Sequence, residues 1–176
     1  MVLFRVCYVA LKTGLPIEFF KLSGTVVAVY LSSHYYTTLS ALAVKHLIKG
    51  KQFLGGIFDF ILFIILAAIG YGVFIILRML FYRFIKMEAT PKLNKFGGLV
   101  LGIARGILLA SLLMFILVVS GLDYFKVSIG GSYLGRRIFK VVPETYSRLW
   151  NDLVSKIMIN ERLNDRVFTV QRDVSP

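Results

Sequence analysis

Two long apolar runs constrain the fold of this chain more than any other feature. They cover residues 53–77 and 96–122, and their only charged side chains are Asp59 and Arg105. Each run exceeds the roughly 20 residues that a helix needs to cross a bilayer. Of the 176 residues, 57% are hydrophobic and 17% charged, too few charges to cover a soluble domain of this size. The sequence therefore predicts an all-α integral membrane protein.

Two further apolar segments complete the predicted bundle. Residues 22–44 are dotted with Ser, Thr and Tyr and are predicted as another span. Residues 2–11 would rise only about 15 Å as a helix, half of a hydrocarbon core of about 30 Å. We expect a bundle of about four transmembrane helices with a truncated first span. Either the true start lies upstream, or this first segment crosses only half of the bilayer.

The net charge of +12 does not indicate nucleic-acid binding. Lys and Arg cluster at the ends of apolar runs, as in membrane proteins, and form no basic stripe beside aromatic residues. The single cysteine, Cys7, excludes an intramolecular disulfide and a thiolate metal cluster. His34 and His46 lack a metalloprotease motif, and no nucleotide-binding or hydrolase motif is present. No enzyme activity, metal or cofactor is predicted.

The composition changes in the last third of the chain. We divide the sequence into a transmembrane domain, residues 1–125, and a polar tail, residues 126–176. The stretch VPETYSRLWNDLVSKI is predicted as an amphipathic helix, with Pro143 and Glu144 in its first turn. Its apolar stripe, at helical spacing, is Tyr146, Leu149, Trp150, Leu153 and Ile157. It would lie on the membrane surface or pack on the bundle, and the last ten to fifteen residues are expected to be unanchored.

Four small residues recur at every fourth position of the last apolar run: Gly98, Gly102, Gly106 and Ala110. Residues four apart share a helix face, and small-residue faces let membrane helices approach closely. We predict a helix-packing face. Its partner is either a neighbouring span or another copy of the chain, which would make a homo-oligomer.

Arg105 lies beside that face and is costly in a bilayer, at about 2.5–3.5 kcal/mol on insertion scales. It should face the protein interior or a wet cavity. If the third and fourth spans are antiparallel, Asp59 lies about 7 or 8 Å from it along the bundle axis. Such a pair would either be structural, which we favour, or line a polar path for an ion or solute.

The segment Ser32–Thr38 is the other polar feature of the spans. Its tyrosines are typical of a membrane-interface belt. Alternatively, His34 titrates near neutral pH and gates a movement.

Two stretches, SSHYYTTLSALAV at 32–44 and LNKFGGLVLGIARGILLASLL at 93–113, give the chain a resemblance to a known family. Over residues 8–125 it resembles the colicin V production protein (CvpA) family. Gly14 and Glu18 match the glycine and the acid of that family's first loop, whereas Thr13 stands in place of its arginine and Lys12 could substitute. The resemblance implies a four-span protein of the bacterial inner (cytoplasmic) membrane, tied to toxin production or export and to envelope homeostasis.

Some larger relatives carry a trypsin-like protease on the outer side, but nothing after Leu122 resembles one, so no catalytic residue is carried over. Residues 78–95 hold five basic side chains and one acid, which favours the cytoplasm for this connection. The opposite ends of the spans are nearly as basic, with Lys45, Lys49, Lys51, Arg136, Arg137 and Lys140. The outer-side protease of the larger relatives therefore decides the orientation, and the resemblance implies both termini on the outer side. We predict a non-enzymatic protein supporting colicin V production and the envelope. The alternative is a small oligomeric channel or transporter using the Asp59/Arg105 pair. Its expected partners are the lipid bilayer, export or envelope proteins and a second copy.

Overall fold

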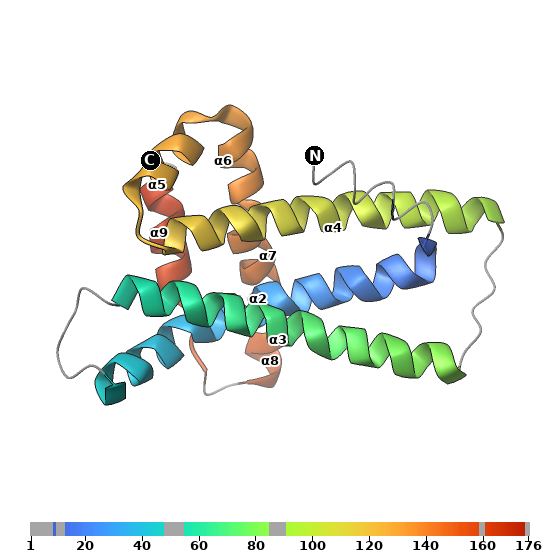
Figure 1. Ribbon diagram of the computed structural model, residues 1–176, viewed down its shortest axis with the longest axis horizontal. Helices are drawn as coiled ribbons and strands as arrows, with labels where there is room; N and C mark the ends of the chain where they lie inside the picture. The colour runs from blue at the N-terminus through green and yellow to red at the C-terminus, as the bar shows by residue number, and fades with distance from the viewer. Residues whose placement is uncertain (1–8, 10–12, 48–54, 85–90, 159–160, 175–176) are drawn as a thin grey trace.

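The computed structural model describes residue 9 and residues 13–47, 55–84, 91–158 and 161–174, and all regular structure within them is helical. Three helices are long: α2 (Leu15–Leu47), α3 (Gly55–Phe84) and α4 (Pro91–Val119). Shorter helices follow: α5 (Asp123–Gly131), α6 (Tyr133–Phe139), α7 (Val141–Leu149), the π-helical η2 (Trp150–Val154), α8 (Ser155–Ile157) and α9 (Asp165–Val174). Figure 1 shows α3 antiparallel to α2 and to α4, with the short helices gathered toward one end of the long ones.

The three long helices are long and apolar enough to cross a membrane, over Leu15–His46, Gly56–Phe81 and Asn94–Val119. The all-helical prediction is confirmed for the described residues, and the three long helices could each span a membrane. The first expected segment, residues 2–11, lies outside the described residues except for residue 9, so the truncated first span stays a prediction. The helix α2 begins at Leu15 rather than near Leu22, because the acid of the expected loop is buried inside the bundle, as described below.

The helices α2 and α3 approach each other closely where they cross. A Cβ placed on Gly70 would lie 2.8 Å from the Cα of Ala28, and one on Gly24 would lie 2.7 Å from the Cβ of Phe74. Small residues allow such contact where no hydrophobic effect drives helices together. On α4, Gly98, Gly102 and Gly106 are buried within the chain and Ala110 is half-buried. A homo-oligomer through that α4 face stays a prediction.

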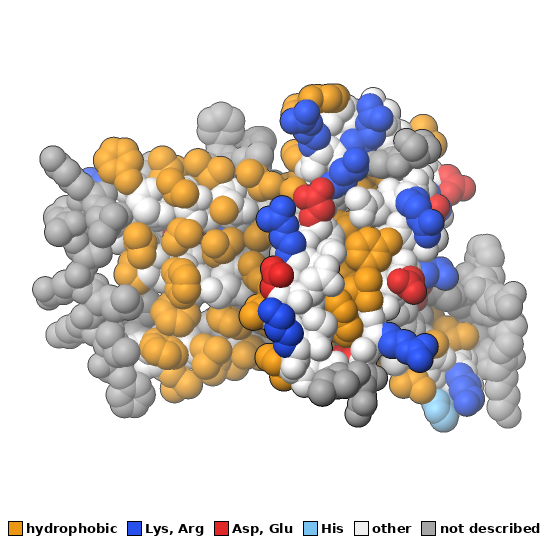
Figure 2. Space-filling view, turned by 180° about the vertical axis from the view of Figure 1, so that it is seen from behind, with side chains coloured by type: hydrophobic (Ala, Val, Ile, Leu, Met, Phe, Trp, Pro, Cys, Tyr) orange, Lys and Arg blue, Asp and Glu red, His pale blue; other side chains and the backbone are white. Residues whose placement is uncertain are grey.

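The outward face of α3 is apolar from Ile57 to Leu80. Its exposed side chains include Ile57, Ile61, Ile65, Ile69, Val73, Ile76 and Leu80. Figure 2 shows a broad apolar area away from the short helices, whereas Lys, Arg, Asp and Glu gather over the end that carries them. This distribution places lipid around the long helices and polar surroundings at the other end.

The helices after α4 pack onto the bundle through a shared core. Phe139 and Val142 are fully buried, and Phe139 stacks on Phe115 of α4. The hydroxyl of Ser111 on α4 accepts a hydrogen bond from the backbone N–H of Val142 and donates one to the carbonyl of Phe139. The expectation of an unanchored chain end is wrong, because Val167 and Val174 of α9 are buried in the same core.

The predicted amphipathic helix forms, but only part of its stripe is buried. Tyr146 and Trp150 face the core, whereas Leu153 is 55% exposed and Ile157 is 77% exposed. The π-helical segment Trp150–Val154 separates the two halves. A π turn places one extra residue in the turn, so side chains beyond it rotate away from the face that a regular helix would present.

Candidate functional site

The first polar cluster surrounds Glu18 in the first turn of α2. Its carboxylate is fully buried, and Oε1 accepts hydrogen bonds from Lys21 Nζ at 2.6 Å and Thr13 Oγ1 at 2.7 Å. Oε2 lies 3.2 Å from Nη1 of Arg105 on α4. A carboxylate near a helix N-terminus is favoured by the helix dipole. One acid is therefore enclosed by two cations, and we call these residues the Glu18 cluster.

The start of α2 is tied to α4 at a second point. Asn94 Oδ1 accepts a hydrogen bond from the backbone N–H of Leu15 at 2.7 Å, which satisfies a free donor of the first turn. Gly14, at φ +80°, packs against the Asn94 side chain, where a Cβ would collide with it. Gly14 therefore allows the chain to turn close to Asn94, and this turn places Glu18 beside Arg105. Both family loop positions, Gly14 and Glu18, serve this one arrangement.

The Asp59–Arg105 pair expected as a possibility from the sequence is not formed. Asp59 lies beside the end of α4, in a cavity that it shares with Val118. Val118 is about 20 Å along α4 from Arg105. Helical side chains lean toward the N-terminus of their helix, so Arg105 reaches away from Asp59 and toward α2. The predicted proximity of Asp59 and Arg105 is wrong because it counts their depths from the ends of the apolar runs, and because Glu18 lies in α2 rather than in a loop.

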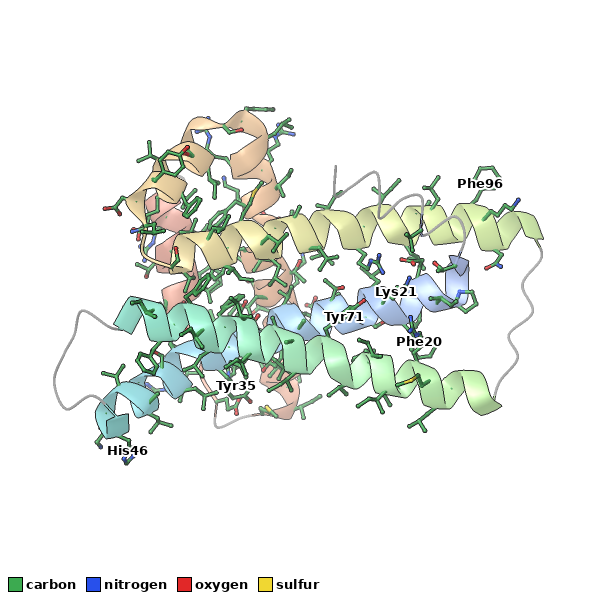
Figure 3. The ribbon with its side chains drawn as sticks, in the orientation of Figure 1. Phe20, Lys21, Tyr35, His46, Tyr71 and Phe96 are labelled. Carbon is green, nitrogen blue, oxygen red and sulfur yellow. The ribbon has the colours of Figure 1, made fainter. Side chains whose placement is uncertain are left out.

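Lys21 lies between α2 and α3. Figure 3 shows Phe20, Lys21 and Tyr71 close together there. These three side chains contribute to a cavity of only about 10 Å³, too small to hold a ligand. The Glu18 cluster therefore joins helices and encloses charge, and Glu18 itself has no access to solvent.

The second polar cluster lies around His34, further along α2. Nε2 of His34 is 2.9 Å from Oε2 of Glu161, and Nδ1 is 2.8 Å from the hydroxyl of Tyr146. The imidazole stacks between Tyr30 and Trp150, with ring centroids 5.4 and 5.2 Å away. His34 is thus caged inside the protein rather than placed in a membrane-interface belt. Whether it titrates as a gate stays a prediction.

Asn164 completes this His34 cluster. Its backbone N–H donates to the Tyr146 hydroxyl at 2.9 Å, and its side-chain amide donates to the carbonyl of Ser33 at 2.7 Å and to Thr37 Oγ1 at 3.0 Å. The Tyr146 hydroxyl can then donate its own proton to His34 Nδ1, while Nε2–H donates to Glu161. In this pattern of donors, a neutral His34 ring carries its proton on Nε2. The segment 161–164 is clamped to α2.

The order carboxylate, imidazole, hydroxyl resembles a hydrolase triad, but this geometry opposes catalysis. Tyr146 is fully buried, and burial raises the pKa of Tyr146 to about 12. Its hydroxyl is therefore neither reachable by substrate nor readily ionised. Among the described residues, no three His, Cys, Asp or Glu side chains come together as a metal site. The arrangement can hold segment 161–164 against α2.

Sequence reasoning missed most of these partners. Glu18 is the only acid in α2, and this could have identified it as the partner of Arg105. Glu161 and Asn164 carry no comparable signal, because their positions depend on how the short helices fold back.

Comparison with known proteins identifies the family. The model of the family described as colicin V production protein matches residues 1–143, which reaches from the N-terminus into α7. No curated protein matches the chain, and no solved structure does. The matched region includes the whole Glu18 cluster together with His34. The chain belongs to the colicin V production protein family.

Proposed function

We propose that this chain is a non-enzymatic scaffold of the bacterial inner membrane that supports production or export of a colicin V-like toxin and helps to maintain the envelope. The toxin part follows from the description of its family. The scaffold part rests on one observation: in the Glu18 cluster, the buried carboxylate of α2 pairs with Arg105 of α4 as well as with Lys21 of α2. Charges that pair between helices in this way fix the helices relative to each other.

The free-energy cost of breaking a buried ion pair supports a structural role for the Glu18 cluster. Removing one partner of a buried ion pair costs about 3–5 kcal/mol, because a buried charge is left without compensation. Replacing both partners by neutral groups is much less costly. Arg105, engaged with Glu18, is not available to the Asp59/Arg105 path on which a channel mechanism depended.

Orientation and partners belong to the same proposal. The stretch 78–95, which runs from the end of α3 into the start of α4, lies in the cytoplasm, as its five Lys and Arg residues favour. The charged end that carries the short helices then faces the outer side, where export or envelope proteins would contact it.

A cell assay tests the proposal. Arg105→Gln, Glu18→Gln and the double variant are expressed in a strain lacking its own copy, and membrane abundance, toxin export and survival under detergent stress are measured. We expect Glu18→Gln to lose abundance and function together, because it leaves Lys21 and Arg105 without an acid. Arg105→Gln keeps the Lys21–Glu18 pair and should retain more of both, and the double variant, in which only Lys21 is unpaired, should recover part of what Glu18→Gln loses. A single variant with normal abundance but no export would contradict the scaffold role. Protein-dependent ion flux in reconstituted vesicles would contradict it as well.

A further inference from the structure

A cavity of about 330 Å³ lies where α3 begins and α4 ends. This volume falls at the lower end of the range for ligand pockets. Neither the Glu18 cluster nor the His34 cluster uses its polar lining, which is Tyr36, Asp59, Lys126, Arg166, Thr169 and Asp173. The cavity therefore needs an explanation of its own.

The charges of the lining balance. Asp59 and Asp173 supply two carboxylates, and Lys126 and Arg166 supply two cations. A simple anion would satisfy only the cations, and a simple cation only the carboxylates. A molecule that carries both signs a few bonds apart satisfies all four groups.

A buried hydroxyl in the lining gives an independent indication of a ligand. Tyr36 is 1% exposed, and its hydroxyl has no hydrogen-bond partner among the described residues. Buried polar atoms are almost always paired, and an unpaired one is costly. An oxygen of a bound ligand would accept this hydrogen bond.

The position of the cavity indicates where the ligand comes from. Gly56 and Val119 in its wall are the end residues of two membrane-crossing stretches, so the cavity lies level with the edge of the bilayer. The neighbouring side chains Ile57, Leu117 and Leu122 are apolar and exposed, as lipid contacts are. A lipid can enter from the side with its acyl chains along α3 and α4.

We propose that this cavity binds a phosphate–ammonium zwitterion, namely the headgroup of a phospholipid such as phosphatidylethanolamine. Arg166 and Lys126 bind the phosphate, Asp59 and Asp173 bind the ammonium, and the Tyr36 hydroxyl donates to a phosphate oxygen. Lys126 also lies 3.4 Å from Asp123, whose side chain is 89% exposed. Such surface pairs are weak, which leaves Lys126 free to turn. This site is independent of the proposed toxin role.

Lipid retention by the purified full chain tests the proposal. Native mass spectrometry measures the lipid bound to the protein in the presence of equal amounts of phosphatidylethanolamine and phosphatidylglycerol with the same acyl chains. The measurement is then repeated with added free phosphoethanolamine. We expect phosphatidylethanolamine to be preferred by about tenfold, the ratio given by about 1.4 kcal/mol. Equal retention of both lipids would overturn the proposal. Displacement by equimolar free phosphoethanolamine would overturn the lipid as the source.

Two variants and one matched control locate the binding. Arg166→Gln should lose about tenfold in preference, whereas Arg172→Gln, an exposed position of the same helix outside the cavity, should keep it. Tyr36→Phe removes a hydroxyl that has no partner within the described protein, so it should fold and bind the lipid severalfold more weakly. Thermal unfolding without added lipid checks the fold. If both variants retain lipid as the control does, the cavity is not the binding site.

Discussion

The crossing of α2 and α3 offers a direct test of how tightly this bundle is packed. In Gly70→Ala, the new Cβ would lie 2.8 Å from Ala28 Cα and 3.1 Å from Ala28 N. Carbon atoms prefer separations of about 3.5–4.0 Å, so the helices must separate by roughly 0.7–1.2 Å. A gap of that size forfeits about a quarter to a half of each dispersion contact along the crossing.

Gly72→Ala is the matched control, because nothing lies within 4 Å of a Cβ at that position on the same helix. Both variants gain the same helix propensity, up to about 1 kcal/mol in water. Their difference therefore isolates packing, and we expect Gly70→Ala to be less stable than Gly72→Ala by about 1–3 kcal/mol. This corresponds to roughly 5- to 150-fold in the unfolding equilibrium.

Reversible unfolding in mixed micelles with added SDS, followed by circular dichroism, measures this difference. Equal stability of the two alanine variants would refute the close backbone contact. A Gly70→Ala variant that is more stable than Gly72→Ala would refute it more strongly, because the α2–α3 crossing would then have room for a methyl group.

Three further predictions concern the polar clusters. In double-variant cycles with neutral replacements, the unfolding free energies should show a coupling of more than about 1 kcal/mol between Glu18 and Arg105. The effects of replacing Asp59 and Arg105 should instead add within about 0.5 kcal/mol. Tyr146 has a pKa raised by burial from 10.0 to about 12, so its stabilising effect is complete below pH 10 and is lost as the pH rises toward 12. Alkaline unfolding of Tyr146→Phe should lack this loss, and an unchanged pH profile would contradict a buried phenol. Asn164→Ala should increase the susceptibility of α9 to proteases, and unchanged cleavage would mean that the clamp on α2 is dispensable.

The sequence predicted the spans better than their contacts. The runs 53–77 and 96–122 correspond closely to Gly56–Phe81 and Asn94–Val119, because hydropathy records a local property of each segment. The pairing of Arg105 failed because it depends on the offset between helices, which hydropathy does not record. The sequence also could not show that Tyr146 and Trp150 pack on the bundle while Leu153 does not, because a π turn shifts the face of a helix without changing the residue pattern.

The two clusters together explain how α2 can remain fixed within a bundle that lipid surrounds. Between apolar helices in a membrane, hydrophobic burial supplies no net attraction, so packing and polar contacts must set the register. The Glu18 cluster joins the first turn of α2 to α4, and the His34 cluster joins α2 to segment 161–164 about 24 Å further along. A helix held at two such points can neither slide nor rotate without breaking one of them. These two contacts therefore also fix how the charged end that carries the short helices is oriented relative to the long helices, which the proposed scaffold role requires.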